Sequence, residues 1–158
     1  MTEKELSIVL RELACSQPTP LCKEWTEEWE DDSDIDVLLD KYIRGFDFCV
    51  NNDYPPLDFI RDNFRKEDLH RHNIYLDEKV EIKGAKSGYY VFLGNCTGII
   101  EAHGFNVVSC YLRHDSKIDV TSLGSARVFV TYYDRSGGLA YKDEWGRIKQ
   151  YDRRKKEG

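Results

Sequence analysis

The hydrophobic positions of this chain follow two different periods, and the change between them falls near residue 80. In the N-terminal half, apolar residues recur every three or four positions, which is typical of amphipathic helices. From about Val80 onward, β-branched and aromatic residues alternate with polar ones, which is typical of strands with one buried face. We therefore predict an α+β protein with a helical acidic segment over residues 1–79, a β-repeat region over 80–152 and a basic tail over 153–158.

The N-terminal segment contains several signals for the start of a helix. Thr2 and Glu5 have the spacing of a capping box, so we expect a helix over about residues 3–15. The clearest helical stripe starts after Ser33, and two shorter helices are expected after Pro56.

An acidic and aromatic stretch lies between the first two of these helices. Leu21, Trp25 and Trp29 are four residues apart, which places them on one helical face. Acidic residues surround them: Glu24, Glu27, Glu28, Glu30, Asp31 and Asp32. One interpretation is a short helix that buries two indoles under a solvated acidic face. The other is an acidic docking surface, either for a protein partner or as a mimic of nucleic acid.

The C-terminal region can be written in blocks of ten residues between Ser87 and Tyr151. The second and fourth positions of the central blocks hold small or β-branched apolar residues. The eighth positions are Gly94, Gly104, His114, Gly124, Asp134 and Glu144. Glycine and small polar residues accept the unusual backbone angles of turns. Each block therefore predicts a strand of five or six residues followed by a tight turn.

Two architectures could bury this repeat. A parallel β-solenoid would use two blocks for each coil of about 20 residues. An antiparallel β-sandwich explains the same spacing with hairpins. We favour the solenoid, because every block has the same register and the turns lack the Asn-Gly or Asp-Gly pairs of tight hairpins. We expect the helical segment to cap one end of the solenoid, and Tyr141 and Trp145 to cover the other.

Several phrases of the sequence resemble a known family. They are Leu38–Cys49, Asp53–Pro55, Phe92–Asn95 and Tyr111–Ser116, which lie within residues 35–135. They resemble a family of uncharacterised proteins in phage-like and other mobile elements of gut bacteria. The resemblance carries no catalytic signature, and it implies at most an accessory role.

Composition and charge exclude some classes of protein. The chain has 158 residues, of which 41% are hydrophobic and 33% charged, and no apolar run is long enough to span a bilayer. The N-terminus lacks the apolar region of a secretory signal, so we expect a soluble, cytoplasmic protein without membrane contact, whose five cysteines are reduced. Residues 1–80 hold twenty acidic and ten basic side chains, whereas 81–158 hold nine and thirteen. The excess of acidic groups in residues 1–80 argues against nucleic acid as a partner, because phosphates would be repelled there.

The sequence offers weak candidates for catalysis. No phosphate-binding loop, dinucleotide fingerprint or nucleophile elbow is present. Glu101 and His103 are two apart on one strand face, and His114 could join them in a cupin-like metal site. A metal-dependent enzyme is therefore the alternative function. The function that we favour involves no catalytic activity and no cofactor.

The prediction that we favour is a non-enzymatic interaction or accessory protein. It would bind a protein partner, or a second copy of itself, through the faces of the β-repeat or through the acidic helical segment. Aromatic residues and arginine are enriched where proteins meet. The candidate contact residues are Trp25, Trp29, Tyr111, Arg113, Tyr132 and Tyr133.

Overall fold

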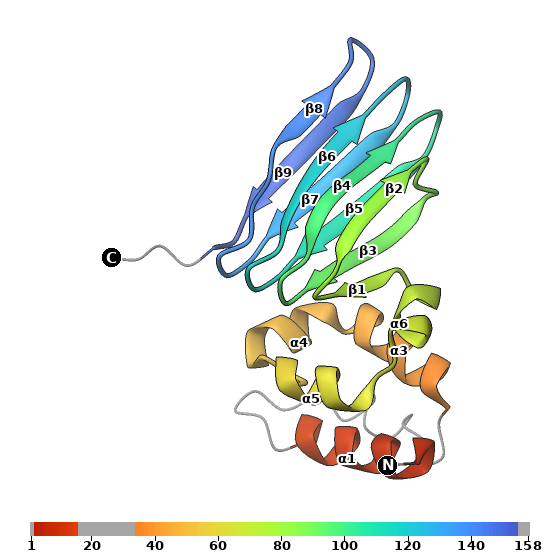
Figure 1. The fold of residues 1–158 in the computed structure, drawn as a ribbon, viewed down its shortest axis with the longest axis vertical. Coiled ribbons are helices and arrows are strands. Elements are labelled where there is room, and N and C mark those ends of the chain that lie inside the picture. The colour runs from red at the N-terminus through yellow and green to blue at the C-terminus, as the bar shows by residue number, and fades with distance from the viewer. Residues whose placement is uncertain (1, 16–33, 155–158) are drawn as a thin grey trace. The chain divides into compact units, whose positions relative to one another are not determined.

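A computed structural model describes residues 2–15 and 34–154 of the chain. They belong to two compact units, Met1–His72 and Asn73–Gly158 (Figure 1). The division lies earlier than residue 80 because a strand of three residues already begins at Ile74. A strand this short is invisible to a search for alternating residues.

The described part of the first unit is helical. Its helices are α1 (Glu3–Cys15), α3 (Ile35–Arg44), α4 (Phe46–Asn52), α5 (Leu57–Asn63) and α6 (Lys66–Arg71). The capping box predicted at the start of α1 is present, since the N–H of Glu5 donates to Thr2 Oγ1 at 3.1 Å. Asp34, rather than Ser33, caps α3, because its carboxylate accepts from the N–H of Val37 at 2.9 Å.

A small apolar core holds these helices together. Its buried members come from α1, α3, α4 and the turn that follows α4: Leu6, Leu10, Ala14, Leu38, Cys49 and Tyr54. The hydroxyl of Tyr54 donates to the carbonyl of Leu10 at 2.8 Å, so the one polar group of this ring is satisfied inside the core. No helix among the described residues is long and apolar enough to cross a membrane.

The second unit is a β-solenoid of two parallel sheets, as the ten-residue repeat predicted (Figure 1). The five-stranded sheet contains, in order, β1 (Ile74–Leu76), β3 (Gly88–Leu93), β5 (Val107–Leu112), β7 (Arg127–Tyr132) and β9 (Arg147–Asp152). The four-stranded sheet contains β2 (Lys79–Lys83), β4 (Thr97–Ala102), β6 (Lys117–Ser122) and β8 (Ala140–Lys142). Consecutive strands therefore alternate between the two sheets.

The register of the sheets confirms a coil of two blocks. Val108 pairs with Val128, and Ile118 lies one coil after Gly98 in the other sheet. From β3 onward each residue pairs with the one twenty positions later. Because all of these pairings are parallel, the antiparallel sandwich is excluded.

The second and fourth block positions point inward, and their side chains form the core between the sheets. Buried examples are Val108, Cys110, Ile118, Val120, Val128 and Val130. Gly98 departs from this apolar column for a steric reason. A Cβ on Gly98 would lie 1.8 Å from the carbonyl oxygen of Val80 in the preceding coil, so no larger residue fits there.

The eighth block positions make the turns. Gly94, Gly104, His114, Gly124 and Asp134 all have positive φ, between 56° and 69°. Glycine adopts this left-handed conformation without strain, and aspartate and histidine are among the residues that tolerate it best. Five of the six residues of this column therefore meet one repeated backbone requirement, whereas Glu144 does not have positive φ.

The C-terminal end of the solenoid differs from the prediction. Tyr141 is 53% exposed and Trp145 70% exposed, so these rings do not cover the last coil. Tyr141 occupies an outward position of β8, and Trp145 lies in the turn before β9, which directs both away from the core.

Candidate functional site

The outer face of the five-stranded sheet has an unusual composition. Its outward residues on β5, β7 and β9 fall into three rows across the strands. The rows are Val107–Arg127–Arg147, Ser109–Phe129–Lys149 and Tyr111–Thr131–Tyr151. Tyr89 on β3 extends the second row beside Ser109. These ten residues contain three cations, four aromatic rings and no carboxylate, and we call them the aromatic–basic face.

Ring contacts order part of this face. Tyr89 and Tyr111 stack with their ring centroids 6.1 Å apart and their planes 25° from parallel. At the other side of the face, Lys149 Nζ lies 5.3 Å from the centre of the Tyr151 ring. These contacts restrict the side chains of Tyr89, Tyr111, Lys149 and Tyr151.

The outer face of the four-stranded sheet is different. Its equivalent outward positions include three carboxylates, those of Glu81, Glu101 and Asp119. Glu81 lies 3.2 Å from the ammonium of Lys83, so acidic and basic groups are mixed on this side. The two outer faces of the solenoid therefore differ in charge. The face of the four-stranded sheet mixes acidic and basic groups, whereas the aromatic–basic face has basic groups only.

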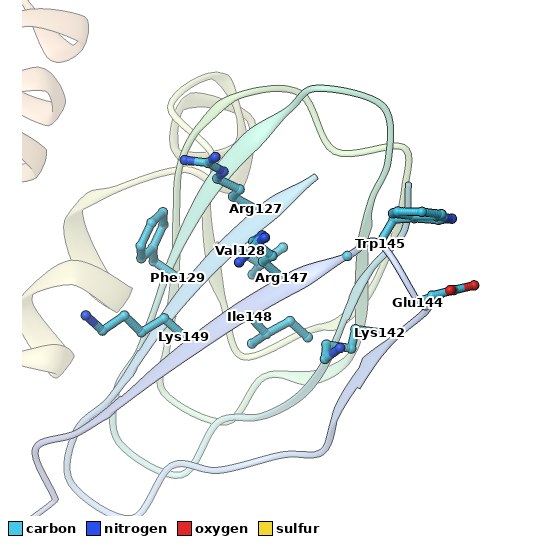
Figure 2. A pocket seen from close by; sticks show the side chains of 10 residues that line it. Arg127, Val128, Phe129, Lys142, Glu144, Trp145, Arg147, Ile148 and Lys149 are labelled. Atoms are coloured by element: carbon cyan, nitrogen blue, oxygen red, sulfur yellow. The ribbon is translucent and has the colours of Figure 1, made fainter. Parts of the chain in front are cut away.

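A hollow of about 780 Å³ adjoins the aromatic–basic face at the last coil (Figure 2). Its charged and aromatic lining includes Arg127, Lys142, Arg147, Lys149, Glu144 and Trp145. Figure 2 shows Arg127 and Lys149 on one side of the strands, and Lys142 and Trp145 on the other. Four cations against one carboxylate give the hollow a positive potential, which attracts anionic groups.

The structure distributes the predicted contact residues unevenly. Tyr111 lies on the aromatic–basic face as expected for a surface residue. Tyr132 is buried instead, because it occupies an inward position, and its hydroxyl hydrogen-bonds Gln150 at 3.1 Å. Trp25 and Trp29 lie outside the described residues.

Arg113 and Tyr133 are also buried rather than displayed. Each immediately follows a strand and packs where the chain enters a turn. The guanidinium of Arg113 donates to the carboxylate of Asp134 at 3.1 Å, so its charge is used within the fold. These two residues stabilise the turns and do not contribute to an exposed surface.

The three residues of the metal alternative do not meet. Glu101 and His103 form a pair at 3.1 Å on the β4 side of one turn. His114 lies in the next turn, after β5, and its Nδ1 accepts from the N–H of Gly94 at 2.9 Å. Successive turns lie at opposite ends of the strands, so the third ligand is directed elsewhere. Among the residues that the structure describes, no three histidine, cysteine or carboxylate side chains are grouped to hold a metal ion.

Sequence reasoning missed most of the aromatic–basic face because it compared all blocks together. Alternate blocks belong to different sheets, so the first and third positions of neighbouring blocks lie on opposite sides. Comparing every second block aligns Arg127 with Arg147 and Phe129 with Lys149. A comparison of every second block would therefore have shown, from the sequence alone, that these rows contain no carboxylate.

Comparison of the chain with protein-family models, with curated proteins and with solved structures finds no match. The resemblance to proteins of mobile elements therefore stays a prediction.

Proposed function

We propose that this chain is a non-enzymatic interaction protein that binds a protein partner on the aromatic–basic face. The observation that carries this proposal is the composition of that face, in which aromatic rings and cations occupy neighbouring rows without a carboxylate. Aromatic residues and arginine are enriched at protein interfaces relative to the rest of the surface.

The shape of the sheet supports the same function. The outer residues lie on strands whose inward side chains are buried, so the surface is held by a packed core. Tyr89 is 53% exposed although it stacks on Tyr111, and Val107, two residues before the register partner of Tyr89, is 44% exposed. Exposed apolar groups that adjoin one another on a rigid sheet gain free energy when a partner removes them from water.

Site-specific crosslinking tests this proposal in cells of the source organism. A photoreactive phenylalanine derivative replaces Ser109, at the centre of the aromatic–basic face, and the control replaces Thr121 on the outer face of the other sheet. We expect one dominant partner to crosslink at position 109 and not at 121. Equal crosslinking at both positions, or crosslinking at 121 alone, would contradict the proposal.

A matched pair of tyrosines then tests the energetics with the purified partner. Tyr89 and Tyr141 are both 53% exposed, but they belong to different sheets. We expect Tyr89→Ser to weaken binding at least tenfold, about 1.4 kcal/mol, and Tyr141→Ser to leave it unchanged. Isothermal titration calorimetry measures both affinities.

A further inference from the structure

Within the part of the chain that the structure describes, the last strand of the five-stranded sheet has a free edge. Among the described strands, β9 pairs with β7 alone. In a parallel sheet, the backbone groups of a strand point alternately to its two neighbours, so β9 presents a row of N–H and C=O groups to an absent tenth strand.

One half of this end is covered by the chain itself. The guanidinium of Arg154 donates to the carbonyl of Ser136 at 3.2 Å and lies over the Tyr132 ring, 5.3 Å from its centre. The other half, at the start of β9, opens into the hollow, where Ile148 is only half-buried although its register partner Val128 is buried. The uncovered part of the edge therefore has both unpaired backbone groups and an apolar side chain.

The charges around this edge determine which kind of strand can pair with β9. Arg147 and Lys149 point outward from β9, and Arg127 and Lys142 line the same hollow. An antiparallel pairing of β9 with a second copy, centred on Ile148 or Lys149 in the uncovered half of the strand, would set Arg147 opposite Lys149 or Lys149 opposite the same lysine. Like charges directly opposite each other destabilise a strand pair, whereas opposite charges stabilise it. The edge thus disfavours its own copy and favours an acidic strand.

We propose that the free edge of β9 accepts an extended acidic segment of a partner protein as an added strand. The alternation of β9 specifies the segment. Carboxylates at every second position would lie beside Arg147 and Lys149 on the outer face, and β-branched residues between them would cover Ile148 from the inside. This inference rests on the proposed function for the class of partner, and it names the chemistry of one segment of that partner.

A synthetic peptide tests the added strand with the full chain. The probe is a short, end-blocked peptide in which glutamate alternates with valine. The control peptide has the same composition, with the glutamates grouped at one end and the valines at the other. We expect the alternating peptide to bind at least tenfold more tightly in calorimetry, and hydrogen exchange of the β9 amides that point away from β7 to slow when it is bound.

Two charge variants connect binding to the edge. Lys149→Glu should weaken the alternating peptide at least tenfold, whereas Lys79→Glu, at an exposed position of β2 in the other sheet, should not. Circular dichroism checks that both variants remain folded.

Four results would overturn the inference. They are equal binding of the two peptides, binding without protection of β9, tighter binding of a single-stranded DNA oligonucleotide than of the alternating peptide, and self-association of the chain through β9 in the absence of peptide. If peptide binding is absent while the crosslink at position 109 persists, the inference of an added strand is wrong and the proposed function is unaffected.

Discussion

The carboxylate of Asp134 accepts a hydrogen bond from the backbone N–H of His114, which lies 2.9 Å away in the turn one coil earlier. His114 repeats the arrangement, since its Nδ1 accepts from the N–H of Gly94 at 2.9 Å. Three turns stacked at the same edge of the solenoid, one from each coil, are thus connected by side chains that bond the backbone of the turn one coil earlier. This ladder stabilises the stacking of coils at one edge of the solenoid, independently of the apolar core.

Removal of the Asp134 carboxylate should destabilise the fold. In Asp134→Ala the N–H of His114 and the guanidinium of Arg113 lose an acceptor in a partly buried site, which typically costs about 1–3 kcal/mol. Urea unfolding of the full chain measures the loss. Asp115→Ala is the control, because Asp115 forms an exposed ion pair with Arg135 that should contribute under about 1 kcal/mol. Equal losses in the two variants would contradict the role of the ladder.

The same carboxylate should make stability depend on pH. Burial alone would raise the pKa of Asp134, but the N–H of His114 and the charge of Arg113 outweigh it and hold the pKa below its usual range. Because the pKa is lower in the folded state, the stabilisation is complete above the unfolded-state pKa, about 3.9, and disappears as the pH falls through the folded-state pKa.

The variant Asp134→Asn isolates this effect, since asparagine keeps an acceptor and tolerates positive φ. We expect wild type to exceed the variant in free energy of unfolding at pH 7, and the difference to shrink as the pH is lowered below 4. A difference that stays constant between pH 7 and pH 3 would exclude a lowered pKa at Asp134.

Two adjacent glycines should respond differently to the same substitution. A Cβ on Gly138 would lie 1.8 Å from the carbonyl oxygen of Ile118 in the coil before it, whereas the nearest atom to a Cβ on Gly137 is a side-chain nitrogen at 3.5 Å. We expect Gly138→Ala to destabilise the protein by about 1–3 kcal/mol, as overpacked sites do, and Gly137→Ala to have a smaller effect. Thermal unfolding compares the two, and a larger loss in Gly137→Ala would mean that the coils are not stacked in this register.

The thiol of Cys110 should be chemically inert in the folded protein. Complete burial raises the pKa of Cys110 to about 12, so almost no thiolate is present at pH 8. Cys15 is exposed and serves as the control. We expect iodoacetamide to label Cys15 and to leave Cys110 unmodified until denaturant is added, as read by peptide mass spectrometry. Labelling of both at similar rates would contradict the burial of the fourth-position column.

The sequence predicted the solenoid because two independent signals shared one period. Inward positions such as Val120 and Val130 repeat every ten residues, and so do the turn positions with positive φ, such as Gly124 and Asp134. The aromatic–basic face was harder to predict. Outward residues do not face the core between the sheets, so the apolar period does not determine their identity, and their grouping depends on which sheet each block enters.

The misplacement of Tyr132 and Arg113 has a related cause. Residue type suggested interface residues, but period-two alternation directs Tyr132 inward, and Arg113 pairs with the Asp134 carboxylate one coil later. Aromatic and arginine side chains serve interiors and interfaces alike, so their direction on the strand decides their role.

The central claim is that the cationic side of the five-stranded sheet binds the partner. Charge reversal at β9 tests this claim most directly. The measurement is the affinity of the partner identified by the Ser109 crosslink for three forms of the chain. They are wild type, the double variant Arg147→Glu with Lys149→Glu, and the control Lys79→Glu with Lys83→Glu, which changes net charge equally on the other sheet. We predict at least a tenfold loss for the β9 variant alone. Equal affinities for all three forms, or equal losses in both variants, would contradict it.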